Sequence, residues 1–304
     1  MRLGTRGSAL ALAQSGAVRE SLRALGAEVE LVTIRTEGDR RIDQRLADVG
    51  GKGLFVKELE EALLDKRVDL AVHSLKDLPA EVPAGLTLAA FPAREDPRDM
   101  LVTRAAGGLD ALRADARIGT SSPRRRALLL AARPDLRVEP LRGNVDTRLR
   151  KLAEGDWDGI VLAAAGLHRL GLAPAHATPL DPRTFVPAVG QGIVAIEARA
   201  DDAETLRWLG ALDDADARAT ADAERAYLAR LGASCVTPMA AHARVRADRI
   251  ELAAVVASED GRQVLRETAS GDRGDAAGLG RAVAERLLAR GAASITALRP
   301  AGRA

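Results

Sequence analysis

Segments with helical periodicity alternate with segments typical of buried strands along the first two thirds of this 304-residue chain. The first block has the expected order helix 8–25, strand 29–34, a helix that ends near 65, strand 70–73 and strand 86–91. The second block has the order strand at 118, helix from 122, strand at 138, helix 144–155, strand 160–162 and a short helix, before another strand at 193–197. Alternation of this kind is typical of open α/β sheets.

The last third of the chain has a different pattern. A long helix at 216–231 precedes two alternating strands at 250–257 and 263–269, and a helix at 276–289 follows. This order predicts a small α+β domain. The length of 304 residues exceeds one typical core, so two or three domains are expected, and 47% hydrophobic with 29% charged residues is typical of a folded soluble protein.

Cys235 is the single cysteine of the chain, so no intramolecular disulfide is possible and a reducing compartment is expected. The first residues lack the apolar core of a signal peptide, and no apolar run reaches the length of a membrane span. We therefore expect a cytoplasmic protein that does not engage a membrane. The four histidines show no metal-ligand spacing, so no metal is expected either.

Residues 117–151 carry ten basic and three acidic side chains, whereas the whole chain has a net charge of only +2. Arginines of this stretch stand where two helices are expected to begin, at 120–126 and at 141–148. Ser122 suits an N-cap and Pro123 the first helical position. Cations at the positive end of a helix dipole make sense if an anion is bound there, because backbone N–H groups and guanidinium groups then converge on it.

Two kinds of anion fit such a cluster. A nucleic-acid surface needs a basic stripe, usually with aromatic side chains for single strands, but the basic residues here are interrupted by strands and no aromatic residue lies within 117–151. A small ligand with carboxylate or phosphate groups fits better, so no nucleic-acid partner is expected.

A second candidate site follows the strand at 70–73, where Ser74, Lys76 and Asp77 come in quick succession. The carboxyl ends of strands in open α/β sheets are where ligands bind. Taken by themselves, these residues are better explained by an ordinary loop with a helix cap. As a site, the segment offers Asp77 as the carboxylate, with Lys76 as the neighbour that keeps it ionised.

Three further motifs have open interpretations. The glycine-rich stretch 50–53 lacks the Walker spacing, so it is either a lid over a ligand or a plain hinge. Residues 190–195 match a dinucleotide fingerprint by letters alone, but they precede a strand and the motif is discounted. From its position, Cys235 is either an inert buried thiol or a reactive one in a loop.

Taken together, eight stretches of the chain closely resemble the porphobilinogen deaminase family. They are residues 5–14, 49–55, 73–79, 94–99, 119–125, 141–148, 187–192 and 235–238. The resemblance spans nearly the whole chain in the right order. It implies two α/β lobes similar to those of type II periplasmic binding proteins and a small C-terminal α+β domain. The domain bounds implied are 1–93 with 193–212, 97–190, and 214–304.

The family joins four porphobilinogen molecules head to tail, releases ammonia at each step and hydrolyses off the linear tetrapyrrole hydroxymethylbilane. The resemblance implies a dipyrromethane cofactor attached by a thioether to Cys235, and it implies that Asp77 is catalytic and stabilises the cation formed as ammonia leaves. Each pyrrole carries an acetate and a propionate. The residues implied to hold these carboxylates are Arg6, Arg124, Arg125, Arg142, Arg148 and Arg169, with Ser8, Lys52, Ser74, Lys76, Thr120 and Ser121 as further donors.

Porphobilinogen is the one partner that the resemblance implies, and it also implies a monomer. The chain departs from the family at Pro123, where relatives usually have leucine, and a proline in the first turn of a helix is expected to be harmless. The alternative is a non-catalytic two-lobed protein that binds small anions. The third domain with Cys235 argues against that alternative.

Overall fold

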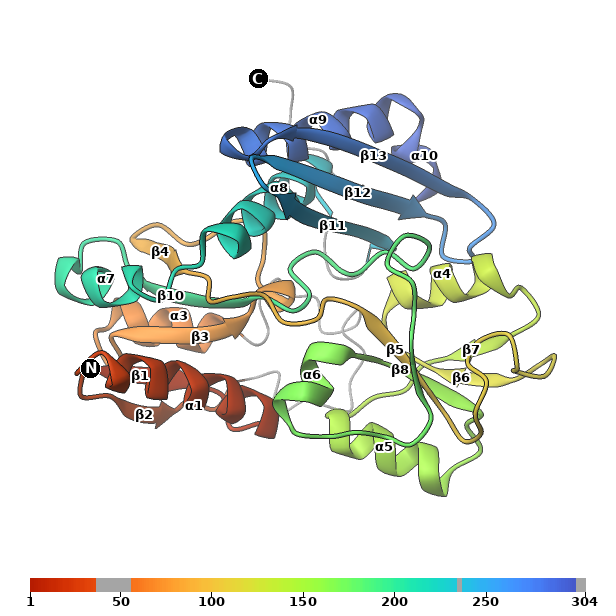
Figure 1. Ribbon diagram of the computed structural model, residues 1–304, viewed down its shortest axis with the longest axis horizontal. Coiled ribbons are helices and arrows are strands. Elements are labelled where there is room, and N and C mark those ends of the chain that lie inside the picture. Colours follow the sequence, from red (N-terminus) through yellow and green to blue (C-terminus); the bar gives the residue numbers. More distant parts are fainter. Residues whose placement is uncertain (37–55, 234–236, 299–304) are drawn as a thin grey trace.

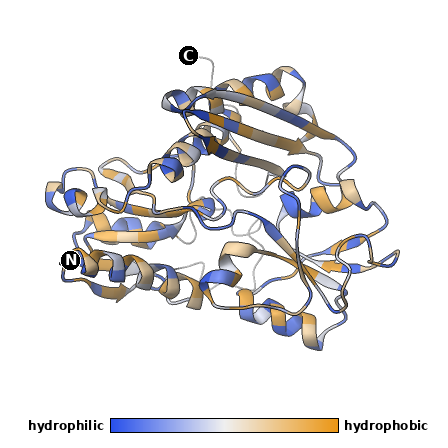
Figure 2. Cartoon of the chain, in the orientation of Figure 1, coloured by the Kyte–Doolittle hydropathy of each residue, from blue (hydrophilic) through white to orange (hydrophobic). Residues whose placement is uncertain are grey.

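A computed structural model describes residues 1–36, 56–233 and 237–298 of the chain. Its strands form three sheets, of five, five and three strands, and each sheet lies in its own part of the molecule (Figure 1). Figure 2 shows apolar stretches on the strands, while most helices mix apolar and hydrophilic residues. Two α/β lobes with a small C-terminal α+β domain were expected from the sequence, and this fold class is confirmed.

The first lobe is built on a mixed sheet with the strand order β2-β1-β3-β10-β4. Its strands are β1 (Arg2–Thr5), β2 (Glu30–Thr33), β3 (Leu70–Ser74), β4 (Leu86–Ala90) and β10 (Val194–Arg199). β1 runs parallel to β2 and β3, whereas β10 runs antiparallel to both β3 and β4. Because β10 returns to this sheet after the whole second lobe, the chain crosses between the lobes twice. The first crossing is residues 91–98 and the second crossing is residues 180–193.

Among the described residues of the first lobe, the helices are α1 (Ala9–Ala24), α3 (Lys57–Leu64) and α7 (Ala203–Gly210). The Ser8 hydroxyl accepts a hydrogen bond from the backbone N–H of Ala11 and so caps α1. The buried side chains Val18 and Leu22 of α1 pack on strand residues such as Leu3 and Leu70 in one apolar cluster. Burial of each such side chain contributes about 1.5–3 kcal/mol to folding.

The second lobe has the strand order β7-β6-β8-β5-β9. Its strands are β5 (Asp99–Thr103), β6 (Arg117–Gly119), β7 (Arg137–Glu139), β8 (Gly159–Ala163) and β9 (Ala177–Pro179). Its helices are α4 (Pro123–Ala132), α5 (Val145–Glu154) and α6 (Ala164–Arg169). Pro123 opens α4 at the first helical position, as expected from the sequence.

The C-terminal part consists of α8 (Ala215–Leu231), an antiparallel sheet in the order β11-β12-β13, and the helices α9 (Ala276–Ala289) and α10 (Ala292–Ile295). The strands are β11 (Met239–Arg246), β12 (Arg249–Ala257) and β13 (Val264–Asp272), and a 3₁₀ turn η2 (Arg273–Asp275) precedes α9. Ala217 and Ala221 of α8 pack against the first lobe, while Val255 of β12 packs against the second. The C-terminal part therefore contacts both lobes.

Glu224 of α8 connects the C-terminal part to both crossings between the lobes. Its fully buried carboxylate forms an ion pair with Arg94 of the first crossing (2.7 Å) and accepts a hydrogen bond from the N–H of Gly190 in the second (2.6 Å). It also accepts from the N–H of Ala243 in β11 (2.7 Å). A buried carboxylate needs such partners, because an uncompensated buried charge costs several kcal/mol.

Candidate functional site

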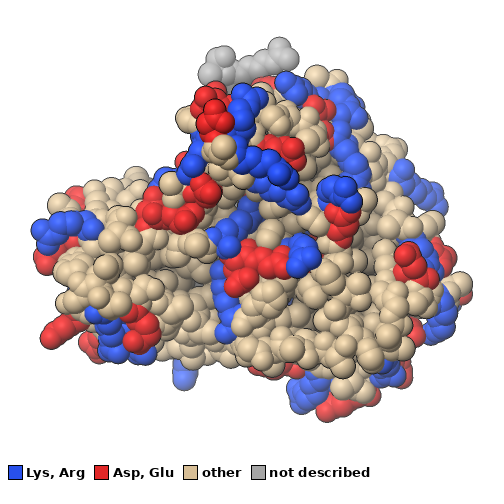
Figure 3. Space-filling view, viewed as in Figure 1, with Lys and Arg blue, Asp and Glu red and all other residues tan. Residues whose placement is uncertain are grey.

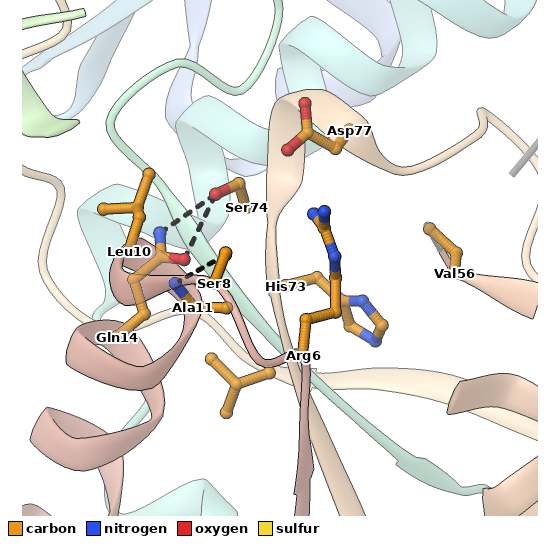
Figure 4. Close-up of a pocket in the computed structure, with 10 residues that line it drawn as sticks. Arg6, Ser8, Leu10, Ala11, Gln14, Val56, His73, Ser74 and Asp77 are labelled. Carbon is orange, nitrogen blue, oxygen red and sulfur yellow. Dashed lines mark hydrogen bonds between the residues drawn. The ribbon is translucent and has the colours of Figure 1, made fainter. Parts of the chain in front are cut away.

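The carboxyl ends of β1 and β3 lie side by side, because these strands are parallel neighbours in the first sheet. Arg6 follows β1, and β3 runs into a short 3₁₀ turn, η1 (Leu75–Asp77), that ends in Asp77. Both residues line one pocket with Ser8 and Ser74 (Figure 4). The remaining lining residues are Leu10, Ala11, Gln14, Val56, Val72 and His73.

Within this pocket the Arg6 side chain points toward the carboxylate of Asp77 (Figure 4). Asp77 itself is exposed. Ser74 is held by Gln14 of α1, whose Nε2 donates to Ser74 Oγ at 2.9 Å. The pocket thus presents a carboxylate, a guanidinium group and hydroxyl groups on well-ordered elements, with hydrogen bonds that fix Gln14 and Ser74.

Beneath the pocket, His73 and Glu197 form a buried pair, with 3.0 Å between His73 Nε2 and Glu197 Oε2. His73 belongs to β3 and Glu197 to β10, so the pair joins the strand that leads to Asp77 to the strand that returns from the second lobe. Both side chains are almost fully buried, and the hydrogen bond satisfies polar atoms that would otherwise be unpaired.

Lys76 is half-buried beside Asp77 and makes one polar contact among the described residues, at 3.5 Å between its Nζ and Oε1 of Gln191. The pKa of Lys76 is lowered to about 8, mainly by desolvation and also by Arg125 and Arg124, while Asp77 and Asp99 act in the opposite direction. Lys76 therefore lies near two arginines and one carboxylate of the second lobe as well as its own neighbour Asp77.

The first arginine cluster of the sequence lies at the start of α4, where Ser122 caps the helix by accepting from the N–H of Arg125. Arg124 and Arg125 are almost fully buried. Both form ion pairs of 2.7 Å with Asp99, the first residue of β5. The sequence suggested that an anion meets this helix start, and the carboxylate that lies there belongs to the chain itself.

The second arginine cluster surrounds α5. Arg148 donates to the carbonyl of Gly143 at 2.7 Å, and desolvation lowers its pKa to about 10. Arg125 and Arg142 also lower the pKa of Arg148, while Asp77 raises it. Asp77 belongs to the first lobe, so Arg148 lies near enough to a carboxylate of the other lobe for that charge to act on its pKa.

Three other predicted residues have mainly structural contacts. Arg169 at the end of α6 donates to the carbonyl of Gly192 in the second crossing at 2.7 Å. Ser121 donates to the carbonyl of Leu141 at 2.9 Å, which ties the two arginine-bearing loops together. Thr120 is buried, and its hydroxyl accepts from the N–H of Ser122.

Lys76, Arg148 and Arg169 are partly buried, yet within residues 1–36, 56–233 and 237–298 none of them has a carboxylate at ion-pair distance. Desolvation lowers the pKa of all three. A protein gains nothing in stability from cations held in this way, because burial disfavours their charge. They fit a ligand that brings its own carboxylates.

Two predicted site residues, Lys52 and Cys235, lie outside the described residues. So does the glycine-rich stretch 50–53.

Among the described residues, no group of three or more His, Cys, Asp or Glu side chains is placed to hold a metal ion. No helix in the described ranges has both the length and the apolar character needed to cross a membrane. Figure 3 shows acidic and basic side chains interspersed over this face of the molecule.

The sequence analysis missed three residues that build the site: Gln14, Asp99 and Gln191. Gln191 is delivered by a turn between two glycines of positive φ, Gly190 (φ 70°) and Gly192 (φ 89°). A Cβ on Gly192 would lie 2.3 Å from the carbonyl oxygen of Glu95, so only glycine lets the two crossings pass so closely. The Gly-Gln-Gly motif was the available signal.

Two family models match the chain in order: "Porphobilinogen deaminase, dipyromethane cofactor binding domain" over residues 1–207 and "Porphobilinogen deaminase, C-terminal domain" over residues 218–289. Curated relatives are similar over nearly their whole length. A porphobilinogen deaminase of Syntrophobacter fumaroxidans is 49% identical over 297 residues, which cover 97% of this chain and 96% of that protein. One of Desulforudis audaxviator is 51% identical over 302 residues, covering 99% and 98%.

Among solved structures, a periplasmic substrate-binding protein of an ABC transporter from Coxiella burnetii is similar, with a TM-score of 0.43 and 18% identity over 70% of this chain and 91% of that one. A nutrient-binding protein from Burkholderia cenocepacia has a TM-score of 0.41 and 15% identity over 69% and 89%.

Proposed function

The chain belongs to the porphobilinogen deaminase family, and on this premise we propose that it deaminates porphobilinogen and joins four molecules head to tail into hydroxymethylbilane, an intermediate of tetrapyrrole biosynthesis. The observation that carries the proposal is the identity of about half of all residues with named porphobilinogen deaminases over 97–99% of the chain. The alternative of a non-catalytic anion-binding protein lacks comparable support.

Asp77 is the residue we assign to the chemistry. A positive charge develops on the pyrrole as its aminomethyl group leaves as ammonia, and a fixed carboxylate stabilises that charge most when it is already in place. Asp77 is supported in this role by its exposure on the pocket side of η1 and by the firm attachment of that turn, since Leu75 donates its N–H to the carbonyl of Ile193 at 3.0 Å. The exposed carboxylate is open to a substrate.

The dipyrromethane cofactor suits the residues present. Its carboxylates need cations, and Lys76, Arg148 and Arg169 have no carboxylate at ion-pair distance among the described residues. When bound, it supplies the primer to which the first substrate is joined. We propose that Cys235 holds it covalently. The side chains we assign to its carboxylates and to those of the substrate are Arg6, Ser8, Lys52, Ser74, Lys76, Thr120, Ser121, Arg124, Arg125, Arg142, Arg148 and Arg169.

The function is tested by adding porphobilinogen to the purified protein and measuring ammonia and product together. We expect four molecules of ammonia for each linear tetrapyrrole formed. A protein that only binds anions would release no ammonia, and that result would remove the proposed function.

Lys76 gives the proposed site a pH dependence. With a pKa of about 8, Lys76 is about nine-tenths in the ammonium form, which carboxylates favour, at pH 7, and this form is lost as the pH rises through 8. At pH 9 only about a tenth of Lys76 is protonated, so the KM for porphobilinogen is expected to rise up to about tenfold between pH 7 and 9. In Lys76→Met the KM should be high and nearly constant over this range. An equal rise in the variant would assign the pH dependence to another group.

We also propose domain bounds, an oligomeric state and a cellular location for the chain. The domain bounds 1–93 with 193–212, 97–190 and 214–304 are supported by the three sheets, since every strand of a sheet falls within one domain. We also propose a monomer in the cytoplasm, with porphobilinogen as its partner and neither nucleic acid nor membrane, and the single cysteine supports the reducing compartment. Size-exclusion chromatography with light scattering measures the oligomeric state directly.

A further inference from the structure

Asp99 is a fully buried carboxylate at the point where the first crossing enters the second lobe. Its Oδ1 accepts from Nε of Arg125 at 2.9 Å and lies 2.7 Å from Arg125 Nη2, while its Oδ2 lies 2.7 Å from Arg124 Nη2. One carboxylate thus compensates two buried guanidinium groups and leaves the cluster with one net positive charge.

The two arginines are fixed on their other sides by backbone carbonyls. Arg124 Nη1 donates to Val186 at 2.8 Å, and Arg125 Nη1 donates to Val161 at 2.9 Å. These contacts leave one N–H on each terminal nitrogen of Arg125 for another partner. Arg124 Nε is buried and has no hydrogen-bond partner among the described residues. The position of Asp99 therefore decides which N–H groups of the pair remain for a ligand.

Asp99 is also joined to the catalytic side of the site through Gln191. Gln191 Nε2 donates to Asp99 Oδ1 at 3.1 Å and to the carbonyl of Pro97 at 2.7 Å, and Gln191 Oε1 lies 3.5 Å from Lys76 Nζ. Gln191 is 1% exposed, so these bonds are not shared with solvent. A continuous polar chain consequently runs from Lys76 in the first lobe through the second crossing to the arginine pair in the second lobe.

We propose that Asp99 is a positioning residue for the carboxylate-binding site: it orients Arg124 and Arg125 toward the ligand and, through Gln191, holds them at a set distance from Lys76 and Asp77. The inference rests on the proposed function. Charged groups that are fixed before binding lose little freedom when the ligand arrives, so the pairing with Asp99 favours affinity as well as folding.

The test compares Asp99→Asn with Glu224→Gln. Both replace a fully buried carboxylate, paired with arginine next to a crossing, by the amide of the same shape. In each holoprotein we would measure the fraction of chains that carry dipyrromethane by intact mass, the KM and kcat for porphobilinogen, and the midpoint of thermal unfolding. Wild-type protein in the same series reports on the proposed function itself, so a failure there is separate from a failure of this inference.

Asp99→Asn is expected to lower the cofactor-bearing fraction severalfold and to raise the KM of the remaining loaded enzyme about tenfold, which corresponds to about 1.4 kcal/mol. Glu224→Gln is expected to lower the unfolding midpoint while its KM stays within about twofold of wild type. Normal loading and KM in Asp99→Asn would overturn the proposal. So would equal losses of loading and KM in both variants, because the role of Asp99 would then be purely structural.

Gln191→Met keeps the inference testable if Asp99→Asn does not fold. Methionine has a similar size but offers no amide, so it breaks the link to Lys76 and leaves both ion pairs of Asp99 in place. We expect near-normal loading with dipyrromethane and a severalfold higher KM. An unchanged KM would contradict the connection between the two lobes.

Discussion

Replacing Asp77 with alanine is expected to lower kcat about 10²–10³-fold, because removal of one fixed group that stabilises developing charge has a cost of this size. The protein should fold normally, since Asp77 is exposed and ends a turn whose backbone is held independently of the side chain. Ammonia release in the steady state measures the rate, and intact mass shows whether dipyrromethane is still attached.

Two further variants separate charge from geometry at this position. Asp77→Asn keeps the shape without the charge and should be nearly as slow as Asp77→Ala, whereas Asp77→Glu keeps the charge on a longer arm and should recover part of the rate. Asp201→Asn, an exposed aspartate between β10 and α7, is the matched control and should turn over normally. A kcat for Asp77→Ala within a fewfold of wild type would remove Asp77 from its assigned role.

The alternation of helices and strands was predictable because burial on both faces of a parallel strand leaves a clear apolar run. The strands at 70–73 and 160–162 are of this kind and correspond to β3 and β8. Less visible elements were missed. β9 has three residues at the edge of its sheet, and β5 is a five-residue strand that carries little pattern of its own.

The return of β10 to the first sheet was not predictable from periodicity. Its six residues are all buried, and such a run is compatible with either direction in a sheet. The antiparallel pairing with β3 and β4 depends on where the second crossing re-enters the first lobe, and that is decided by tertiary contacts such as those of Glu224 with Arg94 and Gly190. β3 and β4 lie more than a hundred residues before β10 in the chain, and the pattern within β10 does not identify them as its neighbours.

The arginine clusters show the same limit at the level of single side chains. Charge density and helix starts predicted that Arg124 and Arg125 meet the anionic groups of a ligand, and in the structure both pair with the carboxylate of Asp99. Asp99 could not be recognised as this partner from local pattern, because an aspartate at the start of a strand is ordinary until the fold buries it beside two guanidinium groups. A positive local charge thus predicts that anionic groups lie nearby. Only the fold shows how many of them are carboxylates of the chain itself.

Changing Cys235 to serine is expected to abolish turnover and to remove a covalent mass from the protein. Wild-type protein purified from cells that make porphobilinogen should exceed the mass of the bare chain by two linked pyrrole units, and Cys235→Ser should have the mass of the bare chain alone. The reason is chemical: a thiolate is a strong nucleophile near neutral pH, a serine hydroxyl is not, and the chain has no second thiol to take its place.

Three comparisons make this result specific to Cys235. Asp77→Ala should keep the added mass, since attachment and turnover are assigned to different residues. Wild-type protein from cells unable to make porphobilinogen should have the bare mass and should react, once unfolded, with one equivalent of a thiol reagent, whereas the loaded protein should not react. Added mass that persists in Cys235→Ser would place the attachment elsewhere.

Because the cations at Lys76, Arg148 and Arg169 lack carboxylate partners in the described residues, loading should also raise the unfolding midpoint of wild type and leave that of Cys235→Ser unchanged.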